Sequence, residues 1–403
     1  MAIYVYGVTI QLASPFSDKA KQWVAGRKIE LHSLPEKKGK RIWFHCASLG
    51  EFEQARPVIE NWGGNHPDDL LILSFFSPSG YEVRKNYNCV DAVVYLPLDT
   101  KTGAKMFLDW AKPDVSLFVK YEFWFHYLNE LKRRNIPTIL FSSIFRREQV
   151  FFKWYGAIFR QMLNMFSKIL VQSEDSVDLL KTISVPSEVC LDTRFDRVKQ
   201  IVDERRSYSL VERFKGDKKV VIAGSTWKRD EQLILSVING KQLKGCKFII
   251  APHEIDSASI SELQKKILAY SVLFSDLNEL TADSSEVLIV DSIGDLASLY
   301  QYGDFVYVGG GFNVGVHNVL EVAVQGVPIF WGPRYQKSLE AIELINRGGA
   351  FSVSSDSELL KIISRLIGDP KETFQFRSNR DYVLERTGGT QKVLMEISIA
   401  LNK

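Results

Sequence analysis

Two glutamates and one arginine follow strand-like runs in the first half of the chain, and their side chains suit acid–base and charge chemistry. Glu51 comes after the apolar run 42–46, Glu122 comes after the run 115–119, and Arg194 comes after the last such run of this half. Two carboxylates facing each other across a cleft are typical of chemistry on sugars. A guanidinium offsets negative charge on a substrate. These three residues are therefore candidate catalytic groups.

Each of these residues also has a purely structural interpretation. A serine three residues before Glu51 gives the spacing of a capping box, in which both side chains satisfy free N–H groups at a helix start. Glu122 could pair with a lysine or arginine and only hold its turn. Arg194 could form a surface ion pair with Asp192 or Asp196. Spacing alone leaves both interpretations open.

A glycine-rich turn in the second half is the clearest candidate for ligand binding. Gly309, Gly310 and Gly311 follow the apolar run 305–308 and precede a segment expected to be helical. Glycines let the backbone approach a ligand closely, and the N–H groups at a helix start favour an anion such as phosphate. The structural alternative is a tight turn with a solvated helix face. The polar residues expected on the first helical turn are His317, Asn318 and Glu321.

The spacing of this turn disfavours two common nucleotide sites. It departs from GxGxxG, because Val314 stands where the third glycine is required and Gly315 follows one residue later. A dinucleotide site of the Rossmann type is therefore disfavoured. The chain contains no GxxxxGK[ST] loop, so a P-loop ATPase is not indicated.

Further strand-to-helix turns are expected at the same sheet edges, because ligands bind beyond the carboxyl ends of parallel strands. Asp291 or Ser292 has the alternative role of a helix N-cap. In the first half, Ser77, Ser79 and Gly80 form a small-residue turn that could contact an acceptor or be a simple turn. The further turn residues of the second half are Ser225, Pro252, His253, Ser292, Ile293 and Gly294.

The elements that must position these turns alternate along the chain. Short apolar runs and longer amphipathic segments follow each other in two series, which predicts an α/β fold of two doubly wound parallel sheets. A charged stretch at 203–219 separates the series and places the domain boundary near 200–218. The predicted strands are 42–46, 70–75, 92–95, 115–119, 138–141 and 169–171, then 220–223, 248–251, 287–290, 305–308, 328–330 and 351–353.

Composition agrees with a folded enzyme and excludes several other classes. The 403 residues suggest two domains, with 45% hydrophobic and 25% charged residues. A net charge of +3 does not argue for nucleic-acid binding. The four cysteines form no CxxC pair and the six histidines show no HxxxH or HExxH spacing, so no metal site is expected and a reducing compartment is indicated.

The N-terminal segment has two interpretations. Residues 2–13 are apolar but fall short of the roughly 20 residues needed to span a bilayer. Residues 16–41 carry eight Lys and Arg against three acids. An apolar helix followed by basic residues can lie in a membrane interface and attract anionic headgroups. The alternative is an amphipathic helix packed on its own domain.

The chain resembles the transferases of 3-deoxy-D-manno-octulosonic acid (Kdo) that act on lipid A precursors. Several ordered motifs carry this resemblance along nearly the whole length. They are Ser14-Pro-Phe16, Gly26-Arg27-Lys28, the turn from His45 to Glu51, Glu122-Phe-Trp124, Thr193-Arg194-Phe195-Asp196, Ala223-Gly-Ser225, Pro252-His253, Gly309-Gly-Gly311, His317-Asn318-Val-Leu-Glu321, Gly326-Val-Pro328 and Gly332-Pro333.

The resemblance implies an inverting GT-B glycosyltransferase that moves Kdo from CMP-Kdo to a phosphorylated, acylated glucosamine disaccharide. It implies Glu51 as proton acceptor, and Glu122 and Arg194 as transition-state stabilisers. It implies no cofactor and no metal, since CMP-Kdo is a substrate. The implied location is the cytoplasmic face of the inner membrane. The implied CMP contacts are Pro252, His253, Ser292, Ile293, Gly294, His317, Asn318, Val319, Leu320 and Glu321.

The corresponding domain bounds are 1–40 for the membrane-associating segment, 41–204 for the acceptor domain and 205–403 for the donor domain, with the last helix packing back on the acceptor domain. Lys120 replaces the first glutamate of the Glu-x-Glu pattern of many relatives, and Arg194 stands where they often have lysine. Ser142 to Ile144 replaces their Asn-Ala-Arg turn. Two alternatives remain open: a GT-B transferase or epimerase using a UDP-sugar, and a non-catalytic nucleotide-binding membrane protein.

Overall fold

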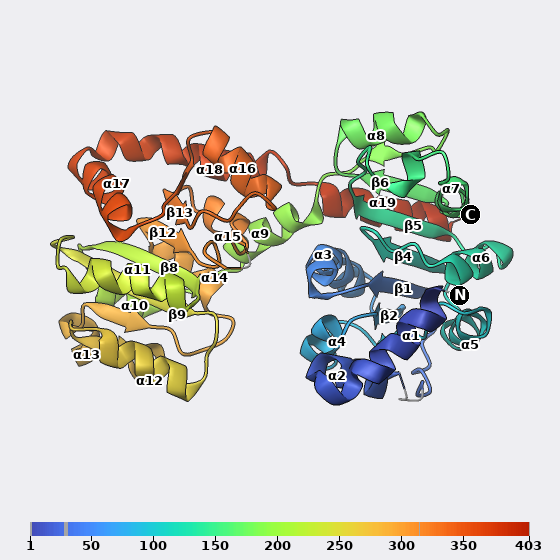
Figure 1. Ribbon diagram of the computed structural model, residues 1–403, viewed down its shortest axis with the longest axis horizontal. Coiled ribbons are helices and arrows are strands. Elements are labelled where there is room, and N and C mark those ends of the chain that lie inside the picture. Colours follow the sequence, from blue (N-terminus) through green and yellow to red (C-terminus); the bar gives the residue numbers. More distant parts are fainter. Residues whose placement is uncertain (1, 28–30, 314, 403) are drawn as a thin grey trace. The chain divides into compact units, whose positions relative to one another are not determined.

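The computed structural model describes residues 2–27, 31–313 and 315–402 and divides into two compact units (Figure 1). The first unit comprises residues 1–197 and 386–403, and the second comprises residues 198–385. The boundary thus lies N-terminal to the expected one, and the last segment of the chain belongs to the first unit. Lys28 and Val314 lie outside the described residues.

The first unit is built on a seven-stranded, wholly parallel sheet of order β3-β2-β1-β4-β5-β6-β7. The chain proceeds from β1 to one side of the sheet and returns to continue on the other, so β1 and β4 flank the switch point. The strands are β1 (Arg41–Cys46), β2 (Leu70–Phe75), β3 (Ala92–Tyr95), β4 (Val115–Val119), β5 (Thr138–Ser143), β6 (Lys168–Val171) and β7 (Glu188–Val189).

Alternating side chains of β1 enter two different cores, as the period of two for a strand requires. Ile42, Phe44 and Cys46 belong to the core beneath α3 and α19. Trp43 belongs to the opposite core with residues of α5 and α6.

The helices of the first unit are α1 (Ala2–Ala13), η1 (Ser14–Phe16), α2 (Asp18–Gly26), α3 (Leu49–Asn65), α4 (Pro78–Arg84), α5 (Lys101–Ala111), α6 (Phe125–Arg133), η2 (Val150–Phe152), α7 (Ala157–Leu163), α8 (Glu174–Lys181), α9 (Thr193–Asp203) and α19 (Gly389–Leu401).

The second unit repeats this plan with a parallel sheet of order β10-β11-β9-β8-β12-β13-β14. Here β8 and β12 flank the switch point. The strands are β8 (Lys219–Thr226), β9 (Cys246–Pro252), β10 (Ser271–Leu273), β11 (Val287–Ile289), β12 (Phe305–Val308), β13 (Ile329–Trp331) and β14 (Ala350–Ser352).

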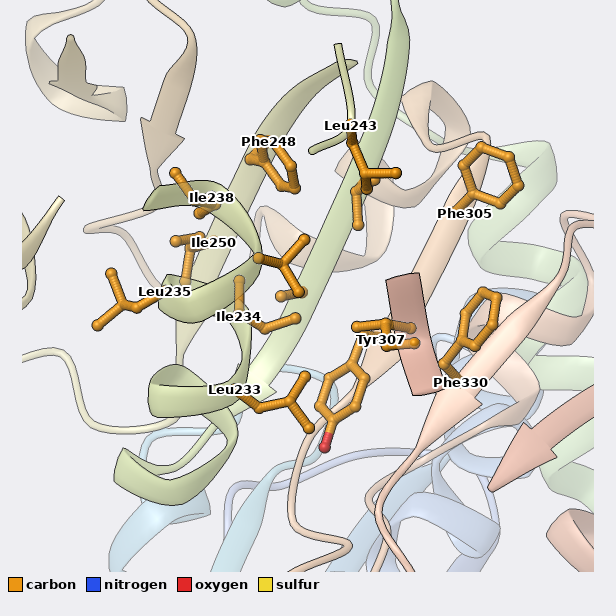
Figure 2. Packing of buried hydrophobic residues seen from close by; sticks show 14 of the residues in the cluster. Leu233, Ile234, Leu235, Ile238, Leu243, Phe248, Ile250, Phe305, Tyr307 and Phe330 are labelled. Atoms are coloured by element: carbon orange, nitrogen blue, oxygen red, sulfur yellow. The ribbon is translucent and has the colours of Figure 1, made fainter. Parts of the chain in front are cut away.

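Helix α11 shows how this sheet is covered. Its residues Leu233, Ile234 and Ile238 pack against Phe248 and Tyr307 of the sheet (Figure 2). The helices of this unit are α10 (Ser209–Lys215), α11 (Lys228–Asn239), α12 (Ser257–Lys266), η3 (Phe274–Asp276), α13 (Glu279–Ser284), α14 (Leu296–Leu299), η4 (Tyr300–Tyr302), α15 (Leu320–Ala323), α16 (Leu339–Asn346), α17 (Asp356–Gly368), η5 (Pro370–Phe376) and α18 (Arg377–Leu384).

The predicted fold class of two doubly wound parallel sheets is confirmed. Every run predicted as a strand forms one, with small differences at the ends. The edge strands β7 and β10 were not predicted, because each mixes a polar residue with one or two apolar ones and no apolar run marks it. Within the described part of the chain, every helix is too short or too polar to cross a membrane.

Candidate active site

The two glutamates singled out in the first unit follow neighbouring strands. β1 pairs with β4 in parallel register. Glu51 lies in the first turn of α3 after β1, and Glu122 lies just beyond β4. Because the carboxyl ends of adjacent parallel strands meet at one edge, both carboxylates stand at the switch point of this sheet.

Glu51 is held by the serine that precedes it in the same turn. Ser48 is the N-cap residue of α3, but its side chain makes no hydrogen bond to the helix backbone. Its hydroxyl donates instead to Glu51 Oε2. The capping-box interpretation is therefore wrong for the serine. The half-buried Glu51 carboxylate stands at the positive end of a long helix, where negative charge is favoured.

Glu122 is nearly buried, with 8% of its surface exposed. His45 Nε2 lies 3.1 Å from its Oε2, and the indole N–H of Trp124 donates to the same oxygen at 2.6 Å. The expected ion pair with a lysine or arginine is wrong, because an imidazole and an indole occupy that place. His45 was named only as part of a motif, and nothing in its spacing signals this contact.

Arg194 forms the ion pair that the structural alternative expected with Asp192. Its Nε and Nη2 donate to Asp192 Oδ2 at 2.9 and 2.7 Å. Asp192 is 5% exposed and also accepts hydrogen bonds from Gln54 and Gln172. Burial alone would raise the pKa of the Asp192 carboxyl, but the charge and hydrogen bonds of Arg194 hold that pKa below its usual range.

This ion pair is tied to the helix that carries Glu51. Gln54, which follows one turn later on α3, donates to Asp192 at 3.0 Å. The hydroxyl of Thr193 donates to the carbonyl oxygen of Gln54 at 2.6 Å. The start of α9 and the start of α3 are therefore fixed to each other, and Arg194 and Glu51 share one scaffold.

The small-residue turn after β2 also reaches this edge. The backbone N–H of Ser77 donates to the carbonyl oxygen of Ala47 at 2.8 Å, next to the turn that leads to Glu51. Ser77 caps α4 by accepting from the N–H of Ser79. Gly80 lies against Phe75, where a Cβ would come within 2.2 Å of the ring. The turn chemistry considered from the sequence is present, and these residues remain proposed acceptor contacts.

In the second unit, the glycine turn packs against neighbouring turns of the protein. A Cβ on Gly309 would lie 2.2 Å from the Ser225 carbonyl oxygen, and one on Gly311 would lie 2.5 Å from Gly332 N. The N–H of Gly309 donates to Gly224 O at 2.9 Å. The close backbone approach that glycine permits is therefore used for packing within the protein. The N–H group of Gly309 is not available to a phosphate.

Asp230 organises this turn, and no sequence pattern had singled it out. The residue is fully buried at the start of α11. Its Oδ2 accepts the backbone N–H groups of Gly310 at 2.9 Å and Trp227 at 3.0 Å, and its Oδ1 accepts the hydroxyl of Tyr307 at 2.7 Å. One carboxylate thus joins the turns after β8 and β12. A lone aspartate near a helix start carries no signal that separates it from a surface cap.

Three aromatic rings stack beside the glycine turn. His253 stacks on both Trp227 and His317, with ring centroids 4.4 and 4.7 Å away, and those two rings lie edge to edge with centroids 6.4 Å apart. The Trp227 indole N–H donates to His317 Nε2 at 2.9 Å, so the His317 proton sits on Nδ1. Burial, helped by nearby His253, lowers the pKa of His317. The stack therefore offers a neutral imidazole N–H at the carboxyl edge of this sheet.

The helix after the glycine turn begins later than expected. α15 starts at Leu320, and Gly315 adopts a φ of +120° that no helix contains. Asn318 lies before the helix, where its side chain accepts from the N–H of Leu320 at 3.2 Å and donates to Glu321 at 2.9 Å. The expectation that His317, Asn318 and Glu321 share one helical turn is therefore wrong.

The turn after β11 is open. Ile293 is 91% exposed, and a Cβ on Gly294 would meet no atom within 4 Å. Ser292 donates to Asp295, and Asp291 accepts from Ser275. The expectation that Asp291 or Ser292 caps the next helix is wrong, since the N-cap residue of α14 is Asp295.

The turns after β8, β9, β11 and β12 of the second unit lie at one sheet edge, as expected for a donor site. Pro252 is buried at the end of β9, and His253 is exposed beside it. Across the described residues, no three His, Cys, Asp or Glu side chains are grouped to hold a metal ion.

The chain is similar in sequence to known transferases over most of its length. Residues 24–197 match the family described as "3-Deoxy-D-manno-octulosonic-acid transferase (kdotransferase)". The 3-deoxy-D-manno-octulosonic acid transferase of Aquifex aeolicus is 28% identical over 84% of this chain and 89% of its own length. That of Rickettsia bellii is 26% identical over 88% of this chain and 86% of its own length.

Solved structures with low sequence identity share the fold. The Staphylococcus aureus MnaA structure with UDP has a TM-score of 0.58 at 12% identity, and the match covers 90% of this chain and 97% of that one. At this identity the likeness shows the fold alone, which is the GT-B arrangement of two Rossmann-like domains.

Proposed function

We propose that this chain, a glycosyltransferase that belongs to the Kdo transferase family, moves Kdo from CMP-Kdo to a lipid A precursor of the lipid IVA type, with inversion at the anomeric carbon. The observation that carries the proposal is the pair of glutamates at the switch point of the first sheet, within a chain related to these transferases over most of its length. The reaction would require no cofactor and no metal.

In the proposed reaction, Glu51 accepts the proton of a glucosamine hydroxyl as that oxygen attacks the anomeric carbon of Kdo. The new glycosidic bond forms as the bond to the CMP phosphate breaks, and the electron pair leaves with the phosphate. General-base catalysis of this kind typically contributes about 10²- to 10⁴-fold. The location of Glu51 at a switch point and its half-buried state support this role.

Glu122 and Arg194 would stabilise the transition state from the same unit. An ionised Glu122 suits the positive charge that develops on the sugar ring as the leaving group departs. Arg194 suits the negative charge of the phosphate or of the Kdo carboxylate. Its attachment to buried Asp192 supports this assignment, because the guanidinium is held in one orientation before substrate binds.

The donor would bind at the carboxyl edge of the second sheet. The stacked His253 and the Nδ1–H of His317 suit the ring and the phosphate of CMP. The open turn at Ser292, Ile293 and Gly294 leaves room for the rest of the nucleotide. The further proposed contacts are Ser225, Pro252, Gly311, Asn318, Val319, Leu320 and Glu321, since the N–H groups of Gly309 and Gly310 bond to Gly224 and Asp230.

We also propose that the chain acts at the cytoplasmic face of the inner membrane. Leu12 and Phe16, near the end of α1, are 72% and 90% exposed, and Trp154 of the first unit is 91% exposed. Exposed apolar side chains near basic ones favour binding to an anionic bilayer surface.

Some basic residues of segment 16–41 contribute to the fold. Arg27 stacks on Trp23 and Phe76, and Lys37 pairs with Asp91, so both contribute to the fold. Among the described residues, the exposed basic ones of this segment are Lys19, Lys21, Lys37, Lys38 and Lys40.

The direct test incubates the chain with CMP-Kdo and a lipid A precursor and counts the added sugars by mass spectrometry. Transfer of at least one Kdo is expected. A parallel thermal-shift comparison of CMP with UDP should show stabilisation by CMP alone, since only a ligand that binds the folded state raises its melting temperature. Stabilisation by UDP alone would instead favour a UDP-sugar enzyme, and binding without turnover would favour a non-catalytic role.

A further inference from the structure

A connected set of polar side chains lies inside the first unit at the switch point of its sheet. Trp43 and His45 come from β1, Ser74 comes from β2, and Glu122 and Trp124 follow β4. His45 and Ser74 are fully buried. Polar groups this deep in a core are costly unless each finds a partner. The proposed function assigns no role to His45.

The shortest hydrogen bonds around Ser74 favour one direction for this network. Trp43 Nε1 can only donate, and it donates to Ser74 Oγ at 2.8 Å. The Ser74 hydroxyl therefore has one hydrogen to give. His45 Nδ1 lies 2.8 Å from Ser74 Oγ, whereas the Phe44 carbonyl oxygen lies 3.5 Å away. The serine hydrogen goes to Nδ1, so the imidazole carries its proton on Nε2.

That proton points at the carboxylate. His45 Nε2 is 3.1 Å from Glu122 Oε2, and Trp124 Nε1 is 2.6 Å from the same oxygen. Trp124 Nε1 also lies 3.0 Å from His45 Nε2, so its N–H would bond to that nitrogen if Nε2 carried no hydrogen. With the Ser74 hydrogen on Nδ1, both N–H groups donate to Oε2. The arrangement therefore holds the Glu122 carboxyl group in one orientation.

We propose that His45 is a positioning residue for the transfer reaction, and that Ser74 sets its tautomer. His45 holds Glu122 through Oε2, which leaves Oε1 for the substrate. The kinetic effect expected from this proposal rests on the proposed function, because it assumes that Glu122 acts on the transition state. The tautomer itself is independent of that assumption and can be measured without turnover.

The first experiment measures the tautomer by NMR on the full chain labelled with ¹⁵N-histidine. The His45 ring signals, assigned by their loss in His45→Gln, are expected to show a protonated Nε2 and an unprotonated Nδ1. Ser74→Ala should shift them toward the other tautomer, because Nδ1 loses its donor. A protonated Nδ1 in the unmodified chain would overturn the proposal.

The second experiment compares His45→Gln with His45→Met. Glutamine places an N–H donor at the reach of Nε2, whereas methionine fills the space without one. The methionine variant is expected to lose about 10²-fold in kcat with little change in KM for the donor, and glutamine should restore most of the rate. Equal losses in both variants would mean a purely structural role.

Ser116→Ala is the matched control, because Ser116 is a buried residue of β4 that bonds to Thr138 outside this network. It should leave the rate unchanged. If His45→Met does not fold, Ser74→Ala provides the kinetic test in its place. Full activity of Glu122→Gln, together with the expected His45 tautomer in the unmodified chain, would contradict the role of Glu122 in the proposed function. It would not contradict the positioning of Glu122 by His45.

Discussion

Buried partners fix the side chains proposed for catalysis and donor binding. Asp192 orients Arg194, and His45 bonds to Glu122. Asp230 joins the two turns that carry Trp227 and the glycines. In each case a buried group holds the side chain or the turn in one orientation. Preorganisation of this kind lowers the cost of reaching the transition state.

Replacing Glu51 with Gln tests the proposed base. The amide keeps the shape of the side chain but cannot accept the proton, so kcat should fall by about 10²- to 10⁴-fold with the fold intact. Glu53→Gln is the matched control, because Glu53 lies on the same helix and pairs with Arg84 at the surface. A folded Glu51→Gln protein with a near-normal rate would remove Glu51 from the mechanism.

The lowered pKa of His317 predicts a pH dependence of stability. Burial, with a contribution from His253, disfavours the charged form in the folded state. The unfolded chain therefore binds more protons, and stability should fall as the pH drops below the ordinary histidine value of 6.5, until the folded-state pKa is passed. Thermal unfolding at a series of pH values should show a weaker dependence in His317→Gln.

His32→Gln is the control for this series, since His32 is an exposed residue of the first unit. It should keep the pH dependence of the unmodified chain. An identical pH dependence in His317→Gln would show that other groups cause the effect.

The positions of candidate site residues could be predicted from the sequence better than the partners that they contact. Glu51 and Glu122 were located at strand ends because apolar runs precede them. Their contacts to Ser48 and His45 could not be predicted, because these depend on which strands are neighbours and which face of β1 a side chain enters. Asp230 was missed altogether, since its partners lie about 80 residues away on another strand.

At the scale of elements, the turn after β12 is held by backbone packing on both sides. Gly309 lies against Ser225 of β8, and Gly311 lies against Gly332 after β13. Three adjacent strands thereby fix one turn. Its shape is set by the protein, and a ligand meets side chains such as His317 and not an open row of N–H groups.

Gly309→Ala should therefore destabilise the second unit. Its Cβ would lie 2.2 Å from a backbone carbonyl oxygen, so the turn must shift. The expected loss is about 1–3 kcal/mol, as for overpacking in a core, measured by chemical unfolding. Gly368→Ala is the control, because a Cβ there would meet no atom within 4 Å. Equal stability of the two variants would contradict the packing argument.

Apolar runs could be predicted as strands even where they are short, whereas the short helix α15 was misplaced. Two of the twelve predicted strands, β3 and β14, are edges of their sheets. The start of α15 was misplaced because the segment before it contains Gly315, whose φ of +120° ends any helical path. A helix of four residues has too few positions to show a period.

At the scale of the whole molecule, the chain passes from the first unit to the second within α9 and returns before α19. α19 packs with α3 and covers one face of the first sheet through Val393, Leu394 and Ile397. Asp196 secures the return, since it accepts the N–H groups of Gly388 at 2.6 Å and Thr390 at 2.7 Å.

Asp196→Ala should loosen this attachment. The loss of two hydrogen bonds at the start of α19 is expected to cost about 1–2 kcal/mol, as for loss of a helix cap. Hydrogen exchange should increase in α19 and on the strands beneath it, while the second unit keeps its protection. Asp203→Ala, at the exposed end of α9, is the control. Unchanged hydrogen-exchange protection of α19 in Asp196→Ala would contradict the proposed role of this contact.

The return of α19 to the first sheet has a consequence for biosynthesis. Residues 198–385 are inserted between two parts of the first unit, so a ribosome releases the whole second unit before it releases the helix that packs on β4 and β5. During translation the apolar side chains of Leu117, Ile139 and Phe141 lack this helix while the second unit can already fold. The second unit can therefore fold first, and the unit that carries Glu51 keeps apolar surface uncovered until α19 has been made.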